Sequence, residues 1–281
     1  MDRKDDVLNE LFVLAMEQRS MIYMISLYNE FQAAIACPNI DSGKVAEIIK
    51  KAPGMTAAVL RLANSSYYGF SKRIGTVKHA LSVLGYKTVG NFLLSQAIKE
   101  SFSSKNRERL NSLWEHSLAT AIAAQEIAKI KHPDLAEHAF TVGLLHDIGK
   151  YMLLSFKKEE MGIIFKKIEE DQYQYSTTLE LEVFDVDHQE IGGFLLKKWL
   201  FPESVVNSVQ THHNLSIETK SDVLPIMIAI ANNIAKAAEI GRSTSGLIES
   251  LPVWIWAPVG INEKNFADIV RQTKTKFYQL K

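Results

Sequence analysis

The 281-residue chain is 47% hydrophobic and 23% charged, a composition that excludes a disordered or fibrous protein. Its 32 basic and 32 acidic residues cancel, so we expect neither DNA nor an anionic membrane as a partner. The single cysteine, Cys37, excludes an internal disulfide and a thiolate metal site. The sequence has no signal-peptide pattern and no run of about 20 apolar residues. We therefore expect a cytoplasmic protein.

Apolar residues recur at three- and four-residue spacing along most of the chain, which predicts an all-α fold. One or two helices are expected near residues 6–36. Further helices are predicted at about 44–51, 57–63, 77–84, 92–98, 109–130, 134–146, 158–170, 175–182, 188–198, 203–213 and 222–240, followed by a tail and a last helix.

Several residues are expected to begin or end helices in the N-terminal part. Asp41 or Ser42 is placed to cap the first helix after the break that follows residue 36. Pro53 is expected to stop that helix, and Thr56 is the predicted N-cap of the next one. Gly85 is positioned as a C-terminal stop.

The most polar and turn-prone stretch in the middle of the chain covers residues 101–107. We place a lobe boundary there. The expected organisation is an N-terminal helical lobe over residues 1–104 and a second helical lobe with a C-terminal tail over residues 105–281.

An adjacent histidine and aspartate, His146 and Asp147, follow the apolar stretch 140–145. Such a pair can place an imidazole nitrogen and a carboxylate oxygen on one ion, and the carboxylate can bridge two ions. Gly149 lets the backbone turn closely, and Lys150 could meet a phosphate as a point charge. The segment is therefore a candidate metal-dependent site.

Further candidate ligands lie on separate predicted helices: His116, His188, His212 and His213. His116 shares a helical face with apolar residues, which directs it inward. Plainer interpretations stay open. A histidine on an apolar face can be a core residue, a His-Asp dipeptide also arises by chance, and His212-His213 can serve a helix C-terminus, where positive charge is favoured.

The order of these motifs resembles the second half of HDOD proteins, and it is also similar to the cyclic-di-GMP phosphodiesterases of the HD-GYP type. The matching features are a helical His116, the run His146-Asp147-Ile148-Gly149-Lys150, Asp187-His188 before glycine, and His212-His213 after Trp199-Leu200-Phe201-Pro202. In the N-terminal part, Val45–Ile49, Met55-Thr56, Leu60–Ser65, Tyr68-Gly69 and Ala80, Leu81, Leu84 and Gly85 resemble the HDOD signature. The resemblance implies an HD-like helical bundle with an additional N-terminal helical lobe.

The resemblance also implies two metal positions. His116, His146 and Asp147 would hold one ion, and Asp147, His188, His212 and His213 would hold a second. A histidine-rich set with a carboxylate suits iron, zinc, nickel or manganese better than calcium. Asn232 stands where the catalytic relatives have a final aspartate, and an amide is a weaker ligand for the first ion. Ser112 replaces a glutamate of some relatives, so a third metal is not expected.

Two functions follow from the resemblance. The first is a bacterial signal-transduction or regulatory module that acts through a protein partner or a small ligand, with a partly retained metal site. Asn232 and the absence of a glycine- and tyrosine-rich motif after His213 favour it, and that absence also argues against cyclic-di-GMP recognition. The second is a metal-dependent phosphohydrolase acting on a nucleotide or other phosphoester, with Asp147 and Lys150 as catalytic residues.

Overall fold

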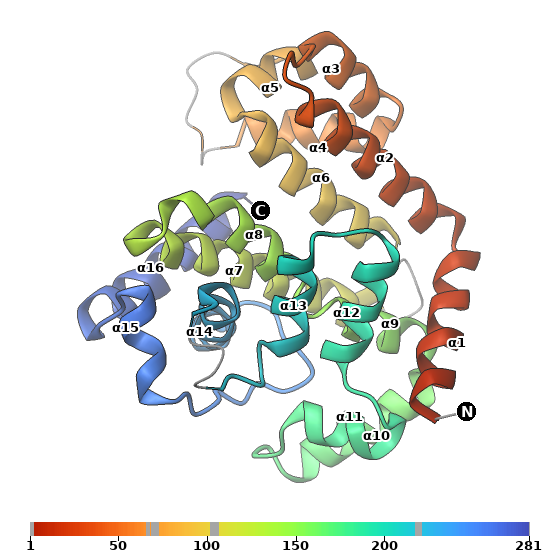
Figure 1. Ribbon diagram of the computed structural model, residues 1–281, viewed down its shortest axis with the longest axis vertical. Coiled ribbons are helices and arrows are strands. Elements are labelled where there is room, and N and C mark those ends of the chain that lie inside the picture. The colour runs from red at the N-terminus through yellow and green to blue at the C-terminus, as the bar shows by residue number, and fades with distance from the viewer. Residues whose placement is uncertain (1–2, 66–67, 69–72, 102–106, 217–220, 281) are drawn as a thin grey trace. The chain divides into compact units, whose positions relative to one another are not determined.

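The computed structural model describes residues 3–65, 68, 73–101, 107–216 and 221–280 (Figure 1). Within these ranges every regular element is a helix and no strand occurs, which confirms the predicted all-α fold. Contacts divide the chain into a small unit, Gln18–Phe102 with Lys276–Lys281, and a large unit, Met1–Glu17 with Ser103–Thr275. None of the described helices has the length and hydropathy that crossing a bilayer requires.

This division differs from the expected lobes, 1–104 and 105–281, at both ends of the chain. Helix α1 (Arg3–Glu17) packs within the large unit, where Phe12 meets Phe194 with ring centroids 6.1 Å apart. At the other end, Leu280 packs against the core of the small unit. Both contacts join segments far apart in sequence, so a boundary read from local composition cannot detect them.

The described residues of the small unit form five helices, together with the end of α16 (Glu263–Leu280): α2 (Arg19–Ala36), α3 (Ser42–Lys50), α4 (Pro53–Ala63), α5 (Val77–Leu84) and α6 (Tyr86–Ser101). Their apolar faces enclose one core cluster, in which Phe31, Ile49 and Met55 are fully buried. Asp41 caps α3 as predicted, because its carboxylate accepts hydrogen bonds from the Gly43 and Lys44 amides at 2.8 and 3.2 Å.

Of two further predictions about helix ends in this unit, one is confirmed and one is wrong. Helix α3 ends at Lys50, before Pro53 as expected, and Pro53 itself begins α4, where its missing N–H has no intrahelical bond to make. Thr56 consequently lies inside the first turns of α4, and its hydroxyl donates to the Ile49 carbonyl at 3.2 Å instead of capping. The stop at Gly85 is confirmed, since Gly85 follows α5 with a φ of 81°.

The large unit is built around three packed helices, α7 (Arg107–Lys131), α8 (Ala136–Leu145) and α14 (Val223–Ala237). Gly143 lets α8 approach α7 closely, since a β-carbon there would lie 2.7 Å from the Ala121 α-carbon. Around these lie α1, η1 (Pro133–Leu135), α9 (Ile148–Phe156), α10 (Lys158–Glu170), α11 (Ser176–Phe184), α12 (His188–Lys198), α13 (Glu203–Thr211), η3 (Val253–Ile255), α15 (Trp256–Val259) and most of α16 (Glu263–Leu280).

Helix α9 was absent from the predicted elements. It begins directly after Asp147, and seven of its nine residues, Ile148 to Leu154, are buried. A helix buried on nearly every face shows no alternation between apolar and polar residues, so periodicity did not separate it from its surroundings. Its position matters, because it places Asp147 at the junction of α8 and α9.

Candidate metal site

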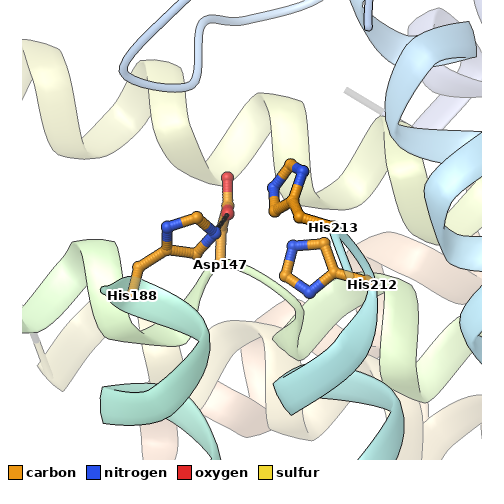
Figure 2. Close-up of side chains that lie close together, drawn as sticks. All are labelled: Asp147, His188, His212 and His213. Atoms are coloured by element: carbon orange, nitrogen blue, oxygen red, sulfur yellow. Dashed lines mark ion pairs between the residues drawn. The ribbon is translucent and has the colours of Figure 1, made fainter. Parts of the chain in front are cut away.

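The structure brings all six sequence-predicted ligands together inside the large unit. They come from different elements: His116 from α7, His146 and Asp147 from the junction of α8 and α9, His188 from the start of α12, and His212 and His213 from the end of α13. Asp147, His146 and His188 are fully buried, and four of the six side chains point toward one another in Figure 2.

Asp147 lies at the centre of this cluster. One carboxylate oxygen, Oδ1, is 3.3 Å from the Nε2 atom of His188. The other, Oδ2, is 3.4 Å from the Nε2 atom of His146 and 3.9 Å from that of His116. The candidate ligand atoms form two groups that share Asp147, and within each group all atoms lie within 4.8 Å of one another: His116, His146 and Asp147; and Asp147, His188, His212 and His213.

The Nε2 atoms of all five histidines are buried and have no hydrogen-bond partner among the described residues. In four of these rings the opposite nitrogen, Nδ1, contacts an oxygen acceptor: His146 with Gly143 O at 2.7 Å, His188 with Glu180 Oε2 at 2.6 Å, His212 with Val209 O at 2.8 Å and His213 with Glu249 Oε2 at 2.7 Å. A proton donated from Nδ1 leaves the Nε2 lone pair free to bind a metal. Because buried polar atoms are rarely unpaired, this donor set fits a metal ion.

The charge states at the site suit ligands. Burial lowers the pKa of His116, His146 and His212, and it brings that of His146 to about 4. For Asp147, burial raises the pKa, but the charges of His146 and Lys150 outweigh this effect and hold it well below its usual value. At neutral pH the imidazoles of His116, His146 and His212 are therefore neutral and the Asp147 carboxylate is ionised, which are the forms that bind metals.

Lys150 is engaged inside the protein. Its ammonium group lies 2.9 Å from Asp147 Oδ1 and donates to the Ser243 hydroxyl at 2.7 Å. Ser243 in turn donates to Asp147 Oδ2 at 2.7 Å. Lys150 thus supplies the positive charge that a buried carboxylate requires, and contact with a phosphate would require this ion pair to open.

Asn232 lies on α14 with only 3% of its surface exposed. Its amide oxygen is buried and has no hydrogen-bond partner among the residues that the structure describes. The group around His116 and His146 contains one carboxylate and two imidazoles. The group around His188 contains one carboxylate and three imidazoles, and it is the more complete ligand set.

Sequence reasoning missed the residues that support the ligands. Glu180 accepts hydrogen bonds from both the backbone and the ring of His188, and Glu249 accepts one from His213. Gln189 accepts from the His213 amide at 2.9 Å. The two residues of each pair lie on different elements, so no local pattern in the sequence pointed to them.

A small pocket adjoins the site. Its lining residues come from the start of α11, from the end of α13, from α14 and from the segment after α14: Tyr175, Ser176, Thr177, His213, Lys236, Ser243, Ser245, Leu247 and Glu249. The volume open to the centre of a water molecule is about 10 Å³, which is room for about one water. A phosphoester does not fit there without movement of the lining.

Comparison with known proteins agrees with this architecture. The family model of the HDOD domain matches residues 23–215. An uncharacterised protein of Treponema pallidum (strain Nichols) is 29% identical over 187 residues, which is 66% of this chain and 36% of that protein. The chain therefore spans little more than a third of that relative's length.

Two solved structures share the fold. One, from Shewanella amazonensis SB2B, is provisionally assigned as a phosphohydrolase; it has a TM-score of 0.72 at 22% identity, with 94% of this chain and 98% of that chain covered. The other, from Marinobacter aquaeolei VT8, is provisionally assigned to signal transduction; it has a TM-score of 0.74 at 18% identity, with 93% and 58% covered. At these identities the likeness shows the fold alone. The helical architecture, the histidine and aspartate cluster and the match over residues 23–215 together show that the chain belongs to the HDOD family.

Proposed function

We propose that this chain is a regulatory HDOD module that binds a divalent transition metal and acts through a protein partner in a signalling pathway. The observation that supports the metal is the set of five buried Nε2 atoms around Asp147 that have no hydrogen-bond partner among the described residues. The assignment of the Marinobacter protein to signal transduction supports the regulatory part.

The tighter metal position is proposed at Asp147, His188, His212 and His213, because this group provides one more imidazole than the other. His116 and His146 would complete a second, weaker position with Asp147. Iron, zinc, manganese or nickel suits such ligands. When bound, the ion supplies positive charge to the buried carboxylate and can act as a Lewis acid.

Regulation is favoured over hydrolysis because the site is closed. His188, Asp147 and His146 are 0% exposed, and Lys150 is held by Asp147 and Ser243. The adjoining pocket has room for about one water. The described residues that line this pocket leave no room for a phosphoester, whereas a small ion can be held by side chains that are already oriented.

Metal-dependent phosphoester hydrolysis is the second candidate. It is favoured by the positions of Lys150 and Asp147, which lie 2.9 Å apart beside the Ser243 hydroxyl. In that function Asp147 would orient the attacking water and Lys150 would stabilise the charge that develops on the phosphoryl group. The provisional assignment of the Shewanella protein as a phosphohydrolase supports this candidate.

The test is elemental analysis of protein purified without chelators. We expect about one iron, zinc, manganese or nickel ion per chain, and loss of that ion in a His146→Ala/Asp147→Ala double variant. His138→Ala is the matched control, because His138 is an exposed histidine on the same α8 helix, and it should keep the metal. Wild-type protein without metal, also after incubation with each ion, would contradict the proposal.

A screen of phosphoesters separates the two candidates. A regulatory module shows no turnover when loaded with each metal. Turnover that Asp147→Asn abolishes would instead establish the second candidate.

A further inference from the structure

The segment that joins α14 to η3, residues 239–251, forms a strap beside the metal site. The strap contains no helix or strand, and its Gly241 has a φ of 62°. A β-carbon at Gly241 would lie 2.3 Å from the Ser112 carbonyl oxygen and 2.4 Å from the His116 amide nitrogen. The strap therefore passes directly against the α7 backbone at a candidate ligand, and only glycine fits there.

Two strap side chains bond to the candidate metal ligands. Ser243 donates to Asp147 Oδ2 at 2.7 Å. Glu249 accepts from the His213 ring at 2.7 Å through one oxygen and from Lys236 at 2.9 Å through the other. Glu249 is thus placed between a candidate ligand and a buried cation.

The backbone of Glu249 is fixed from α14. The Asn233 side-chain amide donates to the Glu249 carbonyl at 2.8 Å and accepts from the Glu249 amide at 3.0 Å. Asn233 is not in either candidate ligand group. It therefore offers a way to loosen the strap without changing a ligand.

The contact to His213 has a defined chemical consequence. A carboxylate at Nδ1 holds the ring proton on that nitrogen, fixes the ring orientation and increases the basicity of Nε2. If the carboxylate is removed, the proton can occupy Nε2 and block the ligand position.

We propose that Glu249 and Ser243 are positioning residues of the metal site, and that docking of the strap and metal binding are coupled through them. This inference rests on the proposed metal binding. Coupling is reciprocal: a docked strap that raises metal affinity by some factor is itself favoured by the metal by the same factor. Metal loss would then loosen the strap and change the surface that the module presents to a partner.

Metal affinity is measured first, by titrating Zn²⁺ or Mn²⁺ in competition with a chromophoric chelator. Glu249→Ala should lower the affinity about tenfold or more, as loss of a group that orients a ligand does. Glu249→Gln keeps an acceptor oxygen without the charge and should fall between Glu249→Ala and wild type. Asn233→Ala should also weaken binding although Asn233 is in neither ligand group, whereas Ser250→Ala, at an exposed strap position, should not.

Hydrogen exchange of the strap amides measures how firmly the strap is docked. Saturating metal should slow exchange of the Arg242 and Glu249 amides, which donate to Ser112 and Asn233 in the docked strap. In Glu249→Ala the slowing of exchange by metal should be smaller. The factor of this decrease should equal the factor by which the metal affinity of the variant falls. Exchange in α10 should not respond to metal, and circular dichroism identifies any variant that fails to fold, in which case Glu249→Gln and Asn233→Ala decide.

The outcomes separate the inference from the proposed function. If wild-type protein binds metal but the Glu249 and Asn233 variants bind it equally tightly, and metal leaves strap exchange unchanged, the coupling is wrong and the metal-binding function stands. If wild-type protein binds no metal, both are overturned.

Discussion

The two units bury different kinds of residue. In the small unit the described core is apolar, and its buried polar residues are Asn91 and Ser95. The large unit instead buries a set of ionisable side chains: His116, Glu126, His146, Asp147, Lys150, Glu180, Asp187, His188 and His212. Apolar burial stabilises a fold by itself, whereas buried charge costs free energy unless it is paired. Ionisable side chains that a protein buries despite this free-energy cost are candidates for functional residues.

The difference implies that the units respond to different perturbations. The small unit should be sensitive to lost volume and insensitive to pH near neutrality. The large unit should be sensitive to protons, to metal and to the loss of a single charged partner. All four tryptophans, Trp114, Trp199, Trp254 and Trp256, lie in the large unit, so tryptophan fluorescence reports that unit alone.

The largest expected effect is the loss of stability of the large unit at acid pH. His116, His146, His212 and His213 have pKa values lowered by burial, whereas an unfolded histidine has one of about 6.5. Below about pH 6.5 the unfolded chain therefore binds protons that the folded chain does not, and stability falls with pH until the folded values are reached, about 4 for His146. For His146 this amounts to about 1.4 kcal/mol per pH unit, or about 3 kcal/mol between pH 6.5 and 4, and the other three histidines add losses of the same sign.

The measurement is urea unfolding of metal-free protein followed by tryptophan fluorescence between pH 7.5 and pH 4.5. Hydrogen exchange in α3 to α6 serves as the control, since the small unit buries no histidine among its described residues. A large-unit transition that is independent of pH over this range would show that the histidines are not buried as neutral groups.

Replacement of the Asp147 carboxylate should give the second-largest loss of stability. Asp147→Asn leaves the Lys150 ammonium buried without its carboxylate, which costs about 3–5 kcal/mol, and it should also remove the metal. Asp268→Asn is the control, because Asp268 pairs with Arg271 on the surface, and such pairs contribute less than about 1 kcal/mol. Similar unfolding free energies for the two variants would contradict a buried ion pair at Asp147.

A cavity in the small unit should give a comparable loss of stability with no effect on metal. Leu93 is 2% exposed within the core cluster, and Leu93→Ala should cost about 3 kcal/mol, seen as faster hydrogen exchange in α3 to α6. Metal content should be unchanged, and Lys87→Ala, at an exposed position on the same helix, should have little effect. A metal-free Leu93→Ala protein would show that the two units are energetically coupled.

The smallest expected effects have opposite signs at two helical glycines. A β-carbon at Gly149 would lie 2.1 Å from the His188 carbonyl oxygen, so Gly149→Ala should push α9 from α12, cost about 1–3 kcal/mol and weaken metal binding. Gly162 on α10 faces open space, and Gly162→Ala should stabilise the protein by about 0.5–1 kcal/mol. Stabilisation by both changes would exclude the close contact between α9 and α12.

Several helices and the candidate metal ligands could be predicted from the sequence. Helices at 77–84, 158–170 and 188–198 occur as predicted, because an amphipathic period and clear end signals coincide there. The six ligands could be named because the resemblance to HDOD proteins supplied their order along the chain. Their meeting around Asp147 could not be derived from spacing, since it depends on how α7, α9, α12 and α13 pack.

What the sequence could not predict depends on long-range contact. Glu249 lies 36 residues after its partner His213, and Ser243 lies 96 residues after Asp147. Both are in a segment without periodicity, so only the folded chain shows that they support the ligands. The attachment of α1 to the large unit was missed for the same reason.

Histidine coordination of a metal in the large unit is tested most directly by X-ray absorption at the edge of the metal found in purified protein. We predict a nearest shell of nitrogen and oxygen, at about 2.0–2.2 Å for zinc, with the multiple-scattering pattern of about three imidazoles for the group at Asp147, His188, His212 and His213. A shell of oxygen atoms without imidazole, or one containing sulfur, would contradict a metal held by these histidines.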